Sequence, residues 1–459
     1  MTVRLVDRPD PGNAYRIDRG CLEMIDEFHA NGILADPERF RELDAKVASE
    51  LEQARRELRD IAGREVNAGS NADLARYLYD ERKLEPPLGL RYTAAGARST
   101  DSETLKSMLQ LDPSVRLVLR IRELAKLRST YTQPLPQMIQ PDGRIRTTFR
   151  HTSTETGRLT SDNPNLQNIP ARTKLGLAIR DCFVAPPGRV LVSCDLSQIE
   201  MVLAGHLSGD ETLLNAIRNG SDIHTLTAVN AMGVAEERRQ YYIGLSLKAK
   251  REDAGGDEEW TDEERADWKR FKQEVRLPAK TVGFGILYGQ KPQGAQYNIV
   301  AQGGPLLPLE QCEQMVESFF RTYPGIRRWM QLQESRATTF GCVWDMFGRV
   351  RLLPTAMSTH APLARKAVRE AGNMPIQSSA QGILKIAMNR AMELVREFRS
   401  LGFNVLPLLQ IHDELVFEAD DDCAEDFASA LRQIMVSAVK LRVDYNASYS
   451  IARSWGQLK

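Results

Sequence analysis

Two acidic residues follow apolar runs of the length and composition typical of buried strands. Asp195 follows the run 190–192, and Asp413 follows the run 405–411, with Glu414 directly after it. Each strand would therefore carry a carboxylate to its end. Two such strands side by side would present paired carboxylates, the hard oxygen ligands that suit Mg²⁺. Taken singly, an acid at a strand end is more often a turn residue or a helix cap.

The segment 276–289 combines cations and aromatic residues at a regular spacing. Arg276, Lys280, Phe284 and Tyr288 recur at intervals of four, which places them on one slowly drifting face of a helix. Cations at the start of such a helix, aided by its dipole, suit a triphosphate, and the aromatic residues suit a sugar and a base. The glycines on either side of Phe284 weaken a helix, and we expect them to let a flat group approach the backbone.

Three ordered segments, 195–200 (DLSQIE), 276–289 and 410–414 (QIHDE), resemble motifs A, B and C of family A DNA polymerases. The segments 156–161, 165–170, 222–224 and 369–377 also resemble that family, so the resemblance runs from about Tyr15 to Lys459. It implies an α+β right-hand polymerase fold with an antiparallel-sheet palm and mainly helical thumb and fingers. The implied division is a leader (1–14), mainly thumb (15–150), palm with motif A (151–220), fingers with motif B and a polar insertion at 236–274 (221–365), and palm with motif C (366–459).

The resemblance implies a DNA polymerase that extends a primer with dNTPs using two Mg²⁺ ions, for which Mn²⁺ can substitute. The implied metal ligands are Asp195, Leu196 and Asp413. Lys280 would protonate the departing pyrophosphate, and Glu414 would add negative potential, although an exposed acid at a hairpin turn is an equally good reading of it. The implied dNTP-binding residues are His224, Arg276, Lys280, Phe284, Tyr288, Glu200 and Gln198.

Two of these residues have structural alternatives. His224 considered alone would be a satisfied structural histidine. Glu200 completes the pattern Ser197-x-x-Glu200, a capping box whose glutamate bonds the backbone of the cap residue. The resemblance instead pairs Glu200 with Tyr288 as a gate that excludes a ribose 2′-hydroxyl, and so implies DNA synthesis.

The implied DNA-binding residues include a minor-groove set, Arg158, Arg369 and Gln377, which would test base-pair shape without reading sequence. Asn373 lies one helical turn after Arg369, but Pro375 is expected to interrupt the helix, so spacing does not place Gln377 on the same face. The full set is Arg158, Arg369, Asn373, Gln377, His412, Gln167, Arg172, Lys126 and Arg128.

Helix signals precede these motifs. A short helix is expected over 21–33, ended by Asn31-Gly32, and a long one is expected from Asp36 as N-cap to Gly63. By itself the long helix suits a coiled-coil-like hairpin. Ser70 and Asp73 predict a further capped helix. The cations of 116–128 form a basic stripe that suits either phosphate contact or a solvated helix face.

The segment 236–274 makes the link between His224 and Arg276 roughly thirty residues longer than the resemblance leads us to expect. Thr261 predicts a capped helix with Trp268, Phe271 and Val275 on one face. We expect the acids of 252–259 to form a solvated loop. A separate exonuclease or replisome protein is a possible partner of this insertion.

Whole-chain features limit the classes of protein. The 61 Lys and Arg balance the 61 Asp and Glu, so a nucleic-acid site must be a local stripe. The six cysteines show no paired spacing, and there is no membrane segment, which favours a cytoplasmic location, in the nucleoid or, for a viral protein, in the infected cell. Only about fifteen residues precede the polymerase region, so no proofreading exonuclease is expected. The alternatives are an inactive primer-template binder and a single-subunit RNA polymerase.

Overall fold

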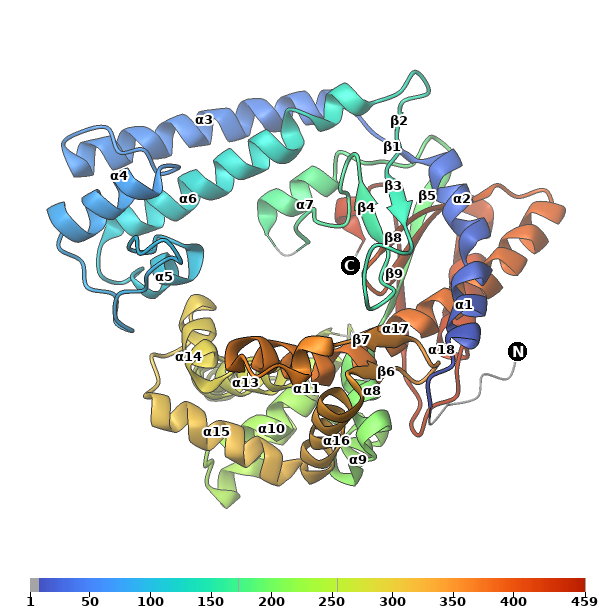
Figure 1. The fold of residues 1–459 in the computed structure, drawn as a ribbon. Helices are drawn as coiled ribbons and strands as arrows, with labels where there is room; N and C mark the ends of the chain where they lie inside the picture. The colour runs from blue at the N-terminus through green and yellow to red at the C-terminus, as the bar shows by residue number, and fades with distance from the viewer. Residues whose placement is uncertain (1–7, 172, 254, 459) are drawn as a thin grey trace. The chain divides into compact units, whose positions relative to one another are not determined.

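The structure, a computed structural model, describes residues 8–171, 173–253 and 255–458 (Figure 1). The chain forms two compact units. The first unit comprises residues 1–48, 126–207 and 332–459, and the second comprises 49–125 and 208–331. Each unit thus joins segments that are distant in the sequence.

The first unit is built on a four-stranded antiparallel sheet with the strand order β10-β5-β9-β8. Its strands are β5 (Arg189–Leu196), β8 (Val405–Ile411), β9 (Glu414–Asp420) and β10 (Ala447–Ala452). The apolar runs expected to be strands are β5 and β8, and β8 and β9 form the expected hairpin. Because β5 and β9 are central, their apolar residues are buried almost completely, as for Leu191 and Phe417. This rigid centre positions the acids at the strand ends.

The long helix α17 (Ala361–Ser400) packs against α18 (Ala424–Val436) and contacts β8 of this sheet. Contrary to expectation, Pro375 does not interrupt α17, which continues through it. A proline inside a helix costs about 3 kcal/mol, and burial of most residues from Ala371 to Met388 offsets that cost. Positions four apart on either side of Pro375 therefore share one face.

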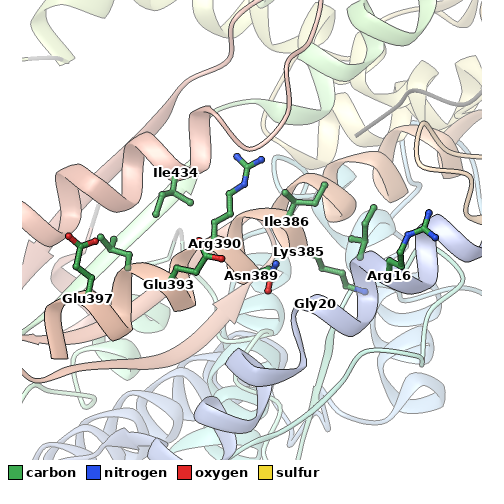
Figure 2. A pocket seen from close by; sticks show the side chains of 11 residues that line it. Arg16, Gly20, Lys385, Ile386, Asn389, Arg390, Glu393, Glu397 and Ile434 are labelled. Atoms are coloured by element: carbon green, nitrogen blue, oxygen red, sulfur yellow. The ribbon is translucent and has the colours of Figure 1, made fainter. Parts of the chain in front are cut away.

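Two N-terminal helices, α1 (Pro11–Gly20) and α2 (Leu22–Asn31), also pack on α17. The helix expected over 21–33 is α2, and it ends at Gly32, whose φ is 59°. Between α1 and α17 the Lys385 ammonium, fully buried, pairs with Asp18 at 2.7 Å. A surface pocket of about 400 Å³ lies beside this contact (Figure 2).

The long helix expected from Asp36 is α3 (Pro37–Ala62), and Gly63 follows it with φ 70°. Asp36 caps it by accepting hydrogen bonds from the backbone N–H groups of Glu38 and Arg39. The expected cap at Ser70 is also present, before α4 (Asn71–Ala75). The basic stripe lies mainly on α6 (Pro113–Leu127). These ends follow from local capping chemistry.

Residues 208–331 of the second unit are mainly helical. Its helices there are α9 (Glu211–Arg218), α10 (Ile223–Ala231), α11 (Glu236–Asp253), α12 (Asp262–Phe271), α13 (Leu277–Leu287), α14 (Pro292–Ala301) and α15 (Leu309–Thr322). The remaining helices and strands of the chain are α5 (Ser102–Ser107), α7 (Lys174–Arg180), α8 (Ile199–Ser208), α16 (Pro324–Phe340), β1 (Ile33–Leu34), β2 (Arg144–Ile145), β3 (Thr148–Arg150), β4 (Thr160–Asp162), β6 (Cys342–Trp344) and β7 (Val350–Leu352).

The solvated loop expected for the acids of 252–259 is present over 257–259, whereas Glu252 and Asp253 end a helix. The insertion forms the helices α11 and α12, and Glu252 lies within α11 and pairs with Arg265 at 3.3 Å. The capping box of Thr261 with Glu264 is present. Aromatic packing explains the folding of the insertion, because the rings of Tyr242 and Phe271 stack at 4.1 Å in a buried cluster.

No helix within the described residues is long and apolar enough to cross a membrane. The six cysteines are free thiols, five of them buried.

Candidate functional site

The sheet of the first unit brings the acids of β5 and β9 together. Asp195 lies opposite Glu414 in the antiparallel register, and the Leu196 N–H donates to the Asp413 carbonyl at 3.2 Å. Burial, followed by the negative charges of Asp413 and Glu414, raises the pKa of Asp195 to about 7. Burial also raises the pKa of Asp413. The expected pairing of carboxylates is therefore present in this unit.

Glu414 has partners that the sequence did not indicate. Its carboxylate accepts a hydrogen bond from the Ser193 hydroxyl. Burial raises its pKa, while the Ser193 bond and the charge of Arg180 act in the opposite direction. Arg180 is buried, donates to the Ile169 carbonyl at 2.9 Å and lies 4.4 Å from the centre of the Trp455 ring. No spacing pattern could have identified Arg180, because its position depends on tertiary packing.

The turn between β8 and β9 is held by amide side chains. His412 adopts φ 57°, and its carbonyl accepts a hydrogen bond from the Gln410 carboxamide. The Gln167 carboxamide in turn donates to the carbonyl and to the side-chain oxygen of Gln410, at 3.0 Å each. Gln167, expected to bind DNA, thus supports the turn that carries Asp413.

A small cavity of about 20 Å³ lies beside Asp413 in the first unit. Among the residues that line it are Arg158, Glu200, Gln381, His412 and Asp413. Arg158 donates to Glu200 at 2.6 Å. The cavity therefore connects the expected gate residue to the expected metal ligand.

The capping-box alternative for Glu200 does not fit the observed helix start. Helix α8 begins at Ile199, after Gln198 with φ 51°. Glu200 is therefore the second helical residue, whereas a capping box needs the third.

The continuous helix α17 places three of the expected DNA-binding residues in one row. Arg369, Asn373 and Gln377 follow one another at intervals of four along one drifting face. Arg369 is exposed, and the other two are partly buried. The face thus becomes less accessible from Arg369 towards the C-terminal half of the helix.

The second unit gathers the expected triphosphate residues. Arg276 donates to Asp222 at 2.8 and 3.1 Å, and its Nε also donates to Thr225 at 3.2 Å. Burial, opposed by Asp222 but reinforced by the charges of Arg276 and Lys280, lowers the pKa of His224 to about 4. His224 is therefore neutral near pH 7 and sits in the positive field of two cations. This set, on α10 and the start of α13, suits an anionic ligand.

The helix that carries these cations differs in detail from the expected one. Arg276 ends a π-helical turn, Lys272–Arg276, and Tyr288 lies in the turn after α13, where it is 40% exposed. Packing against other side chains explains the two glycines that flank Phe284. A side chain at Gly283 would meet the Phe319 ring, and one at Gly285 would collide with Gln290. The approach of a flat group to this backbone stays a prediction.

The basic residues of 116–128 are largely engaged within the protein. Arg128 forms hydrogen bonds to Asp44 at 3.1 and 3.2 Å in the first unit, and in the second Arg120 pairs with Glu50. Arg122 donates to the carbonyls of Ala68 and Thr100. Of the stripe, Arg116 and Lys126 remain exposed. Arg172 lies outside the described residues.

The acids of the first unit suit one divalent cation in particular, Mg²⁺. In the described part of the chain, no three His, Cys, Asp or Glu side chains converge as a ready-made metal site. Mg²⁺ is usually held by one or two carboxylates together with substrate phosphates. Burial raises the pKa of both Asp195 and Asp413, and nearby carboxylates add to the rise: Asp413 and Glu414 act on Asp195, and Glu200 acts on Asp413. A cation would neutralise this negative charge.

The described fold, with its carboxylate-bearing antiparallel sheet and its separate cationic helical set, is that of a nucleic-acid polymerase domain. The family model of DNA polymerase family A matches residues 37–242 and 261–457. The chain belongs to DNA polymerase family A, and the unmatched residues 243–260 fall within the insertion.

Similar proteins agree with this assignment. The chain is 35% identical over 444 residues to the thermostable DNA polymerase I of Thermus filiformis, and 33% identical over 437 residues to DNA polymerase I of Deinococcus radiodurans. These matches cover 96% and 95% of this chain but 48% and 41% of the relatives, so the chain spans about half their length.

Among solved structures, the POL domain of Pol1 from M. smegmatis, in complex with DNA primer-template and dNTP, is similar with a TM-score of 0.79 and 31% identity. That match covers 96% of this chain and 70% of the other. The α+β polymerase fold expected from the sequence is confirmed.

Proposed function

We propose that this chain is a template-directed DNA polymerase that adds dNTPs to a primer 3′-hydroxyl by two-metal nucleotidyl transfer. The observation that carries the proposal is the register of β5 against β9, which sets Asp195 opposite Glu414 and beside Asp413 in a buried, strongly negative environment. Membership of DNA polymerase family A supports the same reaction.

In this proposal Asp195 and Asp413 hold the divalent cations, with the Leu196 backbone as a further ligand. When bound, such ions lower the pKa of the attacking hydroxyl and neutralise charge on the leaving pyrophosphate. The buried Arg180 moderates the negative potential at Glu414, so this acid contributes charge without being a necessary ligand. His412 orients the primer end from its fixed turn.

The second unit supplies triphosphate recognition. Asp222 holds the Arg276 guanidinium by two hydrogen bonds and so presents it in one orientation. Neutral His224 offers a hydrogen bond without the cost of burying a charge. Lys280 provides a proton to the departing pyrophosphate. Tyr288 meets the sugar or base, with Gln198 completing the dNTP-binding set, and the side chain of Phe284, expected in the same role, lies outside the described part of the structure.

Glu200 selects deoxyribonucleotides by occupying the space that a ribose 2′-hydroxyl needs. Its bond to Arg158 supports this role, because it restrains the carboxylate in one position. On DNA, Arg158, Arg369 and Gln377 contact the minor groove near the primer terminus, and Asn373 shares the α17 face of the last two.

Primer extension tests the proposal against its two alternatives. The assay uses each dNTP and each rNTP, with and without Mg²⁺. We expect Mg²⁺-dependent extension with dNTPs only. Efficient extension with rNTPs would favour a single-subunit RNA polymerase, and binding of primer-template without any extension would favour an inactive binder.

We further propose that the polypeptide of these 459 residues does not edit, because the family match already occupies residues 37–242 and 261–457. A labelled primer ending in a mismatch should keep its length in Mg²⁺ without nucleotides. Shortening that is lost in Asp413→Ala would indicate pyrophosphorolysis, whereas shortening that persists would contradict the proposal. The cytoplasmic location and a partner protein at the insertion stay predictions.

A further inference from the structure

Gln381 continues the polar face of α17 into the protein. It follows Gln377 by four residues, so Arg369, Asn373, Gln377 and Gln381 lie along one drifting face of a continuous helix. Arg369 is exposed, whereas Gln381 is only 4% exposed. A carboxamide therefore stands at the inner end of a face that is otherwise accessible.

The amide nitrogen of Gln381 is fully buried and has no hydrogen-bond partner among the described residues. Buried amide groups in proteins nearly always have a partner, from the protein or from an ordered water. The other buried polar residues of this part of α17 all have partners: Ser378 bonds Asp345, Ser379 accepts from the Met346 N–H, and Lys385 bonds Asp18. The Gln381 amide nitrogen differs from them in this respect.

Gln381 lines the cavity of about 20 Å³ whose other polar wall residues are Arg158, Glu200, His412 and Asp413. A volume of about 10 to 15 Å³ of this kind suffices for one water, provided two to four polar partners surround it. The cavity meets both conditions. It is too small for a nucleotide or a metal ion with its own hydration shell.

We propose that Gln381 is a positioning residue of this site: its carboxamide donates to one water in the cavity, and the water donates to the carboxylates of Asp413 and Glu200. The inference rests on the proposed function, since it assigns Asp413 and Glu200 their roles there. The bridge restrains the β8–β9 turn and the start of α8 relative to each other from the side of α17. The Gln410 carboxamide restrains the same turn through the His412 carbonyl.

Positioning matters here because small displacements of a catalytic group have large kinetic effects, up to about 100-fold for 1 Å. Loss of the bridge should therefore lower kcat and leave primer-template affinity nearly unchanged. A packing role for Gln381 would affect thermal stability and would depend on side-chain volume. The two roles predict opposite orders for two substitutions.

Gln381→Met keeps the volume and removes the carboxamide, whereas Gln381→Asn keeps the carboxamide and leaves room for a second water. We expect kcat to fall about tenfold in Gln381→Met, a loss of about 1.4 kcal/mol of transition-state stabilisation, and to stay within about threefold of wild type in Gln381→Asn. The Kd for primer-template should change less than twofold in both. Gln333→Met, at a fully buried glutamine of α16, is the matched control and should retain the wild-type kcat.

A crystal structure at a resolution that shows ordered water supplies a readout independent of activity. We expect one water within hydrogen-bond distance of Gln381 and Asp413 in the wild-type protein, and none there in Gln381→Met. Equal or higher kcat in Gln381→Met than in Gln381→Asn, or a dry cavity in the wild-type crystal, would overturn the inference. If the wild-type protein fails to extend primers, the proposed function falls, and the crystal structure alone still decides whether the bridge exists.

Discussion

At the scale of single residues, burial makes ordinary acids chemically unusual. Asp195 and Asp413 lie at strand ends, where burial first and the charges of nearby carboxylates second raise the pKa of each carboxyl. A bound divalent cation would offset the cost of burying these negative charges, so these positions favour metal binding over a merely structural role. The same packing keeps Glu414 in contact with Ser193 and within the field of Arg180.

Asp195→Ala and Asp413→Ala should each reduce the single-turnover extension rate below about a hundredth of wild type, a loss of about 3 kcal/mol of transition-state stabilisation. Primer-template binding, measured by electrophoretic shift, should persist because the carboxylates serve the chemical step. Asp422→Ala, at an exposed acid just after β9, is the control. A faster residual rate in either variant would contradict the assignment of metal ligands.

Glu200→Ala should raise the relative efficiency of rNTP over dNTP incorporation by about 10- to 100-fold, since it opens the space for a 2′-hydroxyl. The measurement is the ratio of kcat/KM for the two nucleotides. Glu397→Ala, on the far end of α17, should leave that ratio at the wild-type value. Unchanged selectivity in Glu200→Ala would mean that the carboxylate only balances the charge of Arg158.

At the scale of elements, two helical features support the site through long-range packing, which local sequence patterns do not indicate. Helix α17 continues through Pro375 and so aligns its polar residues. The insertion folds as α11 and α12 and packs its aromatic cluster beside the π-helical turn that ends at Arg276. We therefore interpret the insertion as support for the cationic end of α13.

Phe271→Ala should destabilise this cluster by about 3 to 5 kcal/mol, because it removes a fully buried ring that stacks on Tyr242. Since Phe271 directly precedes the turn that carries Arg276, we expect KM for dNTP to rise several-fold with a smaller change in kcat. Steady-state kinetics and thermal melting measure the two effects. Phe340→Ala, at a ring that is 67% exposed on α16, should change neither.

At the scale of the whole molecule, the chain divides its chemistry between two units. The first unit contains the carboxylates, the small cavity and the polar face of α17, and the second contains the cationic set of Arg276, Lys280 and His224. Each set is held by contacts within its own unit. The stability of the first unit also depends on a buried histidine remote from these acids.

His206 makes stability depend on pH. Its Nδ1 accepts the Arg442 backbone N–H at 3.0 Å, and burial, reinforced by the charge of Arg442, lowers its pKa from 6.5 to about 4. Because the folded protein favours the neutral imidazole of His206, the stability that this side chain contributes is fully present above pH 6.5. It is lost as the pH falls towards 4. The loss amounts to roughly 3 kcal/mol.

Thermal melting of the wild-type protein between pH 7 and pH 4 should show this loss. His206→Asn keeps an acceptor near the Nδ1 position without titrating, so its melting temperature should fall less steeply over that range. Parallel curves for the two proteins would show that His206 does not contribute to the acid sensitivity.

The sequence by itself determined the features that depend on local chemistry. Features that depend only on neighbouring residues can be recognised in the sequence. They include strand-end acids such as Asp195, capped helix starts such as Asp36 and Thr261, and the four-residue spacing of Arg276 and Lys280. Together with the motif resemblance, they were sufficient to predict the α+β polymerase fold and its family.

Only the tertiary structure decided which side chains meet across the chain. Arg158 with Glu200, Arg276 with Asp222 and Gln381 with the cavity at Asp413 join residues that are at least 32 positions apart. The continuity of α17 through Pro375 was likewise mispredicted, and the helix α11 was not foreseen. In each case burial of apolar surface outweighs a local preference of about 1 to 3 kcal/mol, and a local preference is all that sequence spacing records.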